Sequence, residues 1–458
     1  MDTNNIIVGL DIGTTKICAI IARKDAEGRT EVLGYGKAPS LGVARGEVAN
    51  IDKTVDAIRQ AAAEAEEQAG VPIRDVYVGI AGQHIKSMQH RGIHTRGNVN
   101  EEIGEDDVRT LIRDMYSLAM NPGERIIHVL PQEFIVDTEL DIKDPVGMFG
   151  NRLEANFHII TGKVSAAQNI RRCVDKAELD FRDMVLEPLA SAASVLDENE
   201  KEAGVALVDM GGGTTDIAIF QDGIIRHTCV IPFGGNIVTK DIKEGCRIMH
   251  NQAERLKTEF GSALAYEAKS NQIISIPGLR GRSAKEISVQ NLANIIQARL
   301  EEIFEQVLFE IKASGYASKL IGGVVLTGGG SQMRNMKQLV EYVTGMDCRI
   351  GHPIEHLAPD YDDALRHPMY ATGLGLVEYV WNRADEMLGE EKPGHQAEAG
   401  RGVRPDATDA DTTEVEAEEE ETVVEKARRN PLTQWWDDMR RTIPDFLLDQ
   451  DLTNDFED

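Results

Sequence analysis

The 458-residue sequence contains little cysteine and no pattern that would pair it. Its five cysteines lie far apart, without a CxxC spacing: Cys18, Cys173, Cys229, Cys246 and Cys348. An odd, scattered set is typical of reduced thiols in a protein core, and not of a disulfide framework or a metal-binding motif. We therefore expect a protein of a reducing compartment such as the cytoplasm.

Long hydrophobic runs and an excess of positive charge are also lacking. No apolar run approaches the roughly 18 residues of a membrane-spanning helix, and the first strand pattern begins by about Ile6, which leaves no room for a secretory signal. The formal net charge of −28 argues against general nucleic-acid binding, which needs a basic surface. With 41% hydrophobic residues, the composition instead fits a soluble globular protein with two domains or lobes.

Two stretches of the chain resemble each other. They read Asp11-Ile12-Gly13-Thr14-Thr15-Lys16 and Asp209-Met210-Gly211-Gly212-Gly213-Thr214-Thr215-Asp216. Each follows an apolar strand pattern and precedes a second one. Glycines let backbone N–H groups approach an anion closely, and successive N–H groups with threonine hydroxyls form a concave anion site. Because a carboxylate beside phosphate requires a cation between them, the aspartates indicate Mg²⁺. Together the loops predict a duplicated fold that binds a nucleotide.

Strand and helix patterns alternate along most of the chain, which predicts an α/β fold with mainly parallel or mixed sheets and helices outside. The stretch 84–163 has the pattern of an insertion, with a helix at 105–120 and strands at 126–130, 132–138 and 153–161. A long helix is expected at 288–314 and a last one at 369–388, before a strongly acidic segment.

A third glycine turn completes the order of motifs. Thr327-Gly328-Gly329-Gly330-Ser331 follows a strand pattern, and Leu186-Glu187-Pro188 opens a helix before the second loop. This order resembles the actin, Hsp70 and sugar-kinase superfamily of ATPases. The resemblance implies an actin-like fold with two lobes, each built on a five-stranded, ribonuclease-H-like sheet, that close on ATP.

The resemblance also implies roles for individual residues. The phosphates of ATP would be held by Gly13, Thr14, Thr15, Lys16, Gly211, Gly212, Gly213, Thr214 and Thr215. Mg²⁺ would be organised by Asp11 and Asp209, and the adenosine admitted by Gly328, Gly329 and Gly330 with Met333 near the base. Glu187 matches the acid that positions the attacking water in bacterial relatives. Glu254 and Lys257, one helical turn apart, match a turn beside the ribose; the alternative is an ordinary surface ion pair.

More narrowly, the chain resembles the FtsA family, the bacterial cell-division actin homologues, over essentially its whole length. The supporting segments are 36–42, 46–51, 78–84 and 231–235. The resemblance implies subdomains 1A (1–84 and 164–200), 1C (85–163), 2A (201–233 and 321–388) and 2B (234–320). An acidic linker (389–427) and a membrane-targeting helix (428–450) would follow. A Hsp70-type chaperone would need a further substrate domain, and a sugar kinase a catalytic base and sugar pocket that we do not find.

The expected C-terminal helix has an apolar stripe beside basic residues. Asn430 and Pro431 suit a helix start. The stripe consists of Leu432, Trp435, Trp436, Met439 and Ile443, with Arg440 and Arg441 next to it. Tryptophan and bases favour an anionic bilayer surface, whereas Asp437, Asp438 and Pro444 oppose it. The alternative is a helix that docks on another protein.

The resemblance thus implies an ATP- and Mg²⁺-binding protein that self-associates into filaments on the cytoplasmic face of the inner membrane at the division septum. It would tether the C-terminal peptide of FtsZ, recruit later divisome proteins and have at most slow ATPase activity. In subdomain 2B, Lys285 and Arg299 would suit an acidic peptide and share a face if both lie on one helix; the alternative is a solvated basic edge. The competing function is that of a soluble ATPase, kinase or chaperone-like protein.

Overall fold

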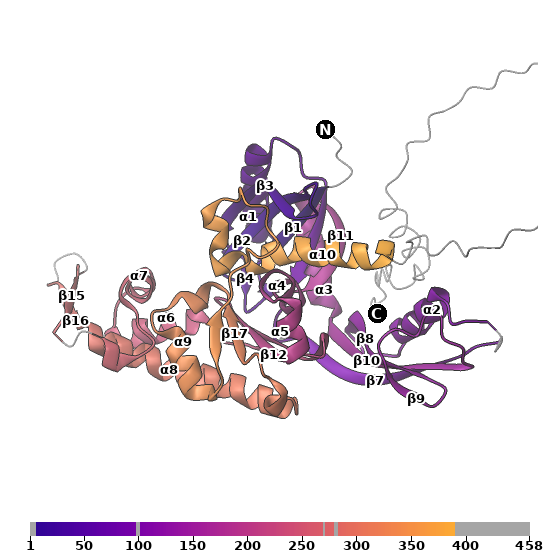
Figure 1. Cartoon of the computed structure of the whole chain (residues 1–458). Helices are drawn as coiled ribbons and strands as arrows, with labels where there is room; N and C mark the ends of the chain where they lie inside the picture. The colour runs from indigo at the N-terminus through magenta and orange to yellow at the C-terminus, as the bar shows by residue number, and fades with distance from the viewer. Residues whose placement is uncertain (1–5, 98–100, 269–270, 279–282, 390–458) are drawn as a thin grey trace, which may run out of the picture. The chain divides into compact units, whose positions relative to one another are not determined.

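The computed structural model describes residues 6–97, 101–268, 271–278 and 283–389. Residues 5–381 form one compact unit. This unit contains two five-stranded sheets and a separate four-stranded sheet (Figure 1). The expected acidic linker from residue 390 onward and the expected helix at 428–450 lie outside the described residues.

The first five-stranded sheet has the order β11-β6-β1-β2-β3. The strands are β1 (Ile6–Ile12), β2 (Lys16–Lys24), β3 (Thr30–Pro39), β6 (Asp75–Ile80) and β11 (Asp180–Leu186). Strand β1 is antiparallel to β2 and parallel to β6, while β2 is antiparallel to β3 and β6 parallel to β11. The first glycine loop is the turn between β1 and β2.

The second five-stranded sheet repeats this arrangement in the order β14-β13-β12-β17-β18. Its strands are β12 (Val205–Met210), β13 (Thr215–Gln221), β14 (Ile224–Ile231), β17 (Val324–Thr327) and β18 (Cys348–Ile350). Again the first strand in sequence lies in the middle, with two strands added antiparallel on one side and two parallel on the other. The expected duplicated fold is confirmed by this shared topology.

Alternating residues of β2 explain how helices cover both faces of the first sheet. Ile17, Ala19 and Ile21 are buried in one cluster with the apolar face of α1 (Ile51–Ala69) and α3 (Val164–Lys176). Their neighbours Cys18, Ile20 and Ala22 are buried in another cluster with α10 (Ala371–Gly389). A strand with both faces covered reads as a continuous apolar run, as seen in the sequence.

The second sheet is covered by a larger group of helices. Its outer face packs on α8 (Val289–Ala313), whose apolar residues recur at helical spacing and are buried from Leu292 to Ile311. Helices α6 (Gly235–Cys246), α7 (His250–Phe260) and α9 (Met336–Thr344) join the same cluster. Further short elements of the lobes include α5 (Glu198–Ala203), β4 (Val43–Ala44), β5 (Glu47–Val48), β15 (Ile273–Ile276) and β16 (Lys285–Ser288).

Helices α4 (Glu187–Val195) and α10 connect the two lobes and cross each other closely. Leu189, Ala192 and Val195 of α4 belong to a buried cluster that includes residues of both sheets. At the crossing, a Cβ atom on Gly375 would lie 1.8 Å from the carbonyl oxygen of Ala190, so only glycine fits there. The crossing places the start of α4 and the start of α10 next to the second glycine loop.

The insertion folds as a four-stranded antiparallel sheet of order β7-β10-β8-β9, packed against α2 (Glu105–Tyr116) (Figure 1). The strands are β7 (Lys86–Thr95), β8 (Glu124–Val136), β9 (Glu139–Ile142) and β10 (Arg152–Lys163). The expectation of separate strands at 126–130 and 132–138 is wrong, because β8 runs through Pro131. The register of β10 shifts beside this proline, and such an irregularity tolerates the missing N–H group. Helix α2 also ends before the expected Met120.

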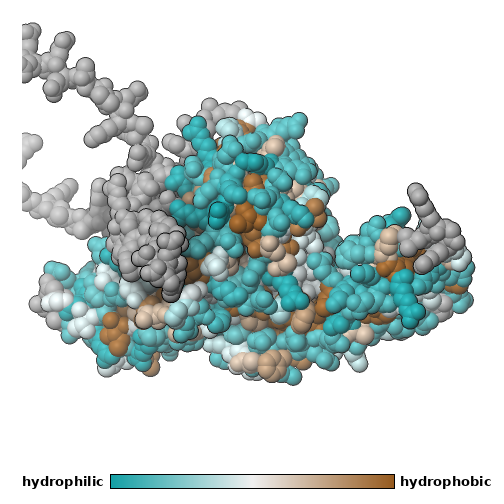
Figure 2. Space-filling view, turned by 180° about the vertical axis from the view of Figure 1, so that it is seen from behind, coloured by the Kyte–Doolittle hydropathy of each residue, from teal (hydrophilic) through white to brown (hydrophobic). Residues whose placement is uncertain are grey.

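The surface carries hydrophobic side chains in several small patches among hydrophilic ones (Figure 2), as is normal for a folded protein. Within the described residues, no helix combines the length and the apolar character needed to cross a membrane. All five cysteines are free thiols, and four of them are buried, as expected. The exception is Cys229, which is only partly buried.

Candidate functional site

The two glycine loops face each other across the lobes. A Cβ atom on Gly212 would lie 2.2 Å from Cγ2 of Thr15, and one on Gly213 would lie 2.5 Å from Oγ1 of Thr14. The second loop is held by α6, because Gly235 N–H donates to Gly211 O (3.0 Å) and Asn236 N–H to Gly212 O (2.8 Å). The structure therefore brings together the loops that the sequence predicted to act on one ligand.

Asp11 stands at the end of β1 and is paired with Lys16 at the start of β2. The distance from Lys16 Nζ to Asp11 Oδ2 is 2.5 Å, and both side chains are largely buried. Burial by itself lowers the pKa of Lys16, but the neighbouring groups, Asp11 foremost, together outweigh it, so that the pKa of the lysine is raised. The first loop therefore carries an ion pair, with the ammonium group beside the glycine turn.

Asp209 occupies the equivalent place at the end of β12. Its Oδ2 accepts hydrogen bonds from Ser191 Oγ of α4 (2.6 Å) and from Thr372 Oγ1 of α10 (3.3 Å). Burial raises the pKa of Asp209, and the bond from Ser191 opposes that shift. Both connecting helices thus converge on this carboxylate.

Asp216 is a site residue to which the sequence analysis gave no role. It lies directly opposite Asp209 in the β12–β13 pair, and its Oδ2 accepts from Thr214 Oγ1 at 2.9 Å. Its Oδ1 is buried without a hydrogen-bond partner among the described residues. Burial and the charge of Asp209 raise the pKa of Asp216 to about 8. Asp216 lies seven residues after Asp209. In the first loop the residue seven positions after Asp11 is Cys18, which is the cross-strand partner of Asp11. This spacing in the strand–turn–strand unit could therefore have indicated Asp216 from the sequence.

Glu187 lies at the first position of α4, against β6. A Cβ atom on Gly79 would be 3.0 Å from Cγ of Glu187, so the glycine makes room for this side chain. Burial raises the pKa of Glu187 well above its ordinary value, and the charges of Asp11, Asp216 and Asp209 add to the shift. Lys16 opposes it. Three buried acids and the partly buried Glu187 thus lie near one another.

This set of acids fits a hard divalent cation. Carboxylates, hydroxyls and water are the ligands that Mg²⁺ prefers, and Mg²⁺ is usually held by one or two carboxylates together with phosphates and waters. Within the described part of the chain, these acids do not form a group whose ligand atoms all lie within 4.8 Å of one another. The unpartnered Asp216 Oδ1 and the raised pKa values show a deficit of positive charge that such an ion would remove.

The third glycine turn lies beside the second loop. Gly328 has a φ of +82°, and a Cβ atom there would lie 2.2 Å from Asp209 Oδ1. A Cβ atom on Gly330 would meet Met210 at 2.6 Å. Met333 follows this turn, is half-buried, and lies near Gly261 at the end of α7. The turn is thus next to the acids, and Met333 lies between it and α7.

Glu254 and Lys257 on α7 form more than a surface ion pair. Lys257 Nζ lies 2.8 Å from Glu254 Oε2 and donates to Gly235 O (3.0 Å) and Thr239 Oγ1 (2.8 Å) on α6. Because Gly235 also binds Gly211, the pair is connected to the second glycine loop through one residue.

Lys285 and Arg299 would share a face only if both lay on one helix, and this condition is not met. Lys285 belongs to β16 and Arg299 to α8, because the chain is extended up to Ser288 before the helix begins. Arg299 is already paired with Asp241 and Glu302, both at 2.5 Å. Four-turn spacing therefore does not align the two side chains. The expected membrane residues, Leu432 to Ile443, lie outside the described residues.

Comparison with known proteins identifies the family. A family model described as "Cell division protein FtsA" matches residues 206–375, and one described as "SHS2 domain inserted in FTSA" matches residues 82–161. "Cell division protein FtsA" of Pseudomonas aeruginosa is 41% identical over 379 residues, which cover 83% of this chain and 90% of the relative. The chain belongs to the FtsA family. The FtsA proteins of Bacillus subtilis and Escherichia coli are 36% and 34% identical, over 84% and 82% of this chain and 85% and 90% of those proteins.

Solved structures support the actin-like fold of this FtsA homologue. A PilM-PilN type IV pilus biogenesis complex aligns with a TM-score of 0.55 at 14% identity, over 81% of this chain and 97% of that chain. MreB5 of Spiroplasma citri bound to ADP aligns with a TM-score of 0.51 at 13% identity, over 84% of this chain and 98% of that chain. At these identities the similarity shows the fold alone. The insertion matched as SHS2 is the feature typical of FtsA.

Proposed function

We propose that this cell-division homologue binds Mg·ATP between its two glycine loops. The observation that carries the proposal is the approach of Gly212 and Gly213 to Thr15 and Thr14 from opposite lobes. Glycine loops offer backbone N–H groups to phosphate, and the lobes can therefore share one nucleotide. In support, MreB5 of the same fold has been solved bound to ADP and to AMPPNP.

The acids and the lysine have complementary tasks in this proposal. Lys16 and the loop N–H groups balance phosphate charge, and Asp11 and Asp209 hold the cation's water or the cation itself. Bound Mg²⁺ would supply the positive charge that screens phosphate from the carboxylates. Gly328 to Gly330 admit the adenosine, with Met333, Glu254 and Lys257 at its border. Ser191 of α4 and Thr372 of α10 hold Asp209 in place. A change at Asp209 on ligand binding would therefore be transmitted to both connecting helices.

We further propose the cellular role that the family resemblance implies. The chain polymerises on the cytoplasmic face of the inner membrane, links FtsZ to it at the septum and recruits later divisome proteins. Subdomains 1A, 1C, 2A and 2B follow the boundaries given above, and Lys285 and Arg299 contribute to the FtsZ-peptide surface of 2B as separate basic points. Each C-terminal helix is a weak anchor, and an array of them in a filament binds strongly because the anchors act together.

Glu187 is the residue that we propose to position the attacking water, because it is the acid at the helix start next to both loops. We predict that Glu187→Gln binds Mg·ATP within about twofold of the wild type but lowers any turnover by at least about tenfold, the usual order for a positioned acid or base. Binding is measured by fluorescence anisotropy of a labelled ATP, and turnover by phosphate release. Failure of the wild type to bind Mg·ATP would contradict the proposed function, and unchanged turnover in the variant would contradict the role of Glu187.

A further inference from the structure

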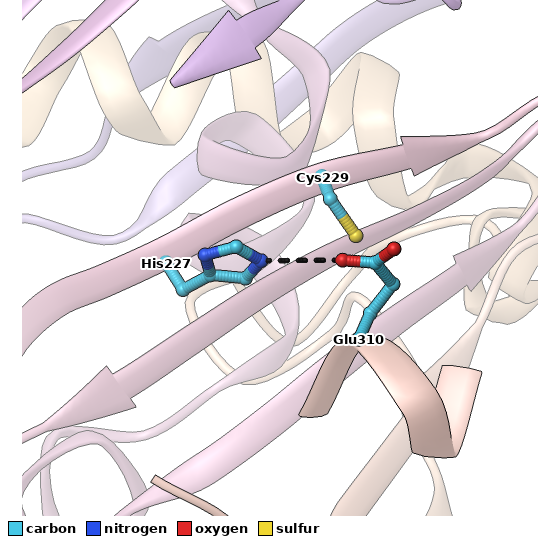
Figure 3. A group of neighbouring side chains, drawn as sticks. All are labelled: His227, Cys229 and Glu310. Atoms are coloured by element: carbon cyan, nitrogen blue, oxygen red, sulfur yellow. Dashed lines mark ion pairs between the residues drawn. The ribbon is translucent and has the colours of Figure 1, made fainter. Parts of the chain in front are cut away.

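A second cluster of ligating side chains lies on the outer face of the second sheet, away from the glycine loops. His227 and Cys229 are two residues apart on β14 and therefore point to the same face. Helix α8 covers this face and presents Glu310 to both (Figure 3). The intervening Thr228 points the other way, since its Oγ1 lies 3.1 Å from Nε2 of His158 on β10. The alternation of side chains along β14 thus places His227 and Cys229 on one face of the sheet and Thr228 on the other.

The three ligand atoms are close enough to share one ion. One atom from each of His227, Cys229 and Glu310 lies within 4.8 Å of the other two, and His227 Nε2 is 3.7 Å from Glu310 Oε2. Zinc bonds of roughly 2.0–2.3 Å in a tetrahedron place neighbouring ligand atoms roughly 3.3–3.8 Å apart. Side-chain rotations that bring these atoms closer by up to about 1.5 Å would therefore complete the geometry.

The surroundings of these atoms favour a metal over a simple ion pair. His227 Nε2 is buried and has no hydrogen-bond partner in the part of the chain that the structure describes. At 3.7 Å the contact between His227 Nε2 and Glu310 Oε2 is longer than a hydrogen bond, whereas a cation bound between the two atoms would be a partner for both.

We propose that His227, Cys229 and Glu310 bind one Zn²⁺ ion, with a water molecule in the fourth position. A thiolate with an imidazole and a carboxylate suits a borderline-soft ion, while Mg²⁺ and Ca²⁺ select oxygen ligands. On binding, the Cys229 thiol gives its proton to solvent and its sulfur bonds to the metal. The ion joins β14 to the last turns of α8, and the site is independent of the nucleotide.

Cobalt substitution in the metal-free full-length chain tests this proposal on the wild type. Co²⁺ is titrated in excess Mg²⁺, which occupies oxygen-only sites. We expect one equivalent of Co²⁺ to produce a near-ultraviolet thiolate-to-cobalt band and the visible bands of a tetrahedral ion, and one equivalent of Zn²⁺ to abolish them. Cobalt binding without the thiolate band would overturn the assignment, as would no binding at all.

Matched variants identify the ligands. Cys229→Ser and Glu310→Gln should each weaken Zn²⁺ binding by more than about tenfold, because even outer contacts to a metal ligand are worth that much. Cys246→Ser, a buried thiol of the same lobe, and Glu305→Gln, an exposed acid of the same helix, should leave it unchanged. A Cys229→Ser chain that keeps its circular dichroism spectrum and still binds the equivalent would overturn the proposal. If the variants do not fold, the wild-type cobalt spectrum decides.

Discussion

Individual residues of the site are explained by charge balance. Asp11 has a lysine partner, Asp209 has two hydroxyl donors, and Asp216 has one unpartnered oxygen. In a buried environment each unbalanced carboxylate favours its protonated form. The nucleotide and its cation would reverse this preference, so the protonation of these acids would change when the site is filled.

The raised pKa of Asp216 has a consequence for stability. Its pKa rises from 3.8 in a solvated aspartate to about 8 in the fold. Between these values the unfolded chain has lost the proton and the folded chain retains it, so the free energy of unfolding falls as pH rises from about 4 to about 8. Above about pH 8 the full penalty is present. Replacement by a neutral amide removes this penalty.

We therefore predict that Asp216→Asn raises the melting temperature of the Mg²⁺- and nucleotide-free chain at pH 8 by about 2–4 °C or more, and by less at pH 5. Differential scanning calorimetry at both pH values measures it. Asp347→Asn, at an exposed position of the same lobe, is the control and should show no such pH dependence. An Asp216→Asn shift that is equal at both pH values would contradict the charge argument.

At the level of elements, the sequence predicted those strands, turns and helices that are determined by residues close to one another along the chain. The strand–loop–strand units around Asp11 and Asp209 follow from apolar runs that end in glycine turns, and α8 (Val289–Ala313) agrees closely with the helix expected at 288–314. The role of Asp216 was missed because it depends on the cross-strand register. The contacts of Ser191 and Thr372 with Asp209 join positions far apart in sequence, so no local pattern could reveal them.

One error at this level has a clear cause. The strands expected at 126–130 and 132–138 are one strand, β8, because a register shift against β10 accommodates Pro131. Here pairing with a distant strand outweighed the local signal. The long helix expected from residue 288 begins at Val289, and Lys285 lies before it, where β16 pairs with β15. Cys229 was likewise grouped with core thiols because its partner Glu310 is distant in sequence.

The facing loops can be tested by a double-mutant cycle. A Cβ atom on Gly212 would lie 2.2 Å from Cγ2 of Thr15, and a serine at position 15 lacks that methyl group. We predict that Gly212→Ala weakens ATP binding about tenfold, a loss of about 1.4 kcal/mol, that Thr15→Ser alone has little effect, and that the double variant recovers most of the affinity. Anisotropy of labelled ATP measures all four chains. Additive effects would show that the loops do not meet.

For the whole molecule, the two lobes and the C-terminal segment have separate tasks in the proposed function. In that proposal the lobes would share a nucleotide, and α4 and α10 would connect its state to their relative arrangement because both hold Asp209. The segment after α10 would supply the tryptophans and arginines for a bilayer surface. ATP would therefore control assembly on a membrane more than it drives chemistry on a substrate.

Co-sedimentation with anionic liposomes tests this claim most directly. The full chain and a chain ending at residue 427 are compared with Mg·ATP, with Mg²⁺ alone and on neutral liposomes, while ATP binding is measured on both chains. We predict that the full chain pellets with anionic liposomes, more strongly with Mg·ATP, and that the shortened chain binds ATP but stays in the supernatant. Equal pelleting of the two chains, or a full chain that binds ATP but never pellets, would contradict it.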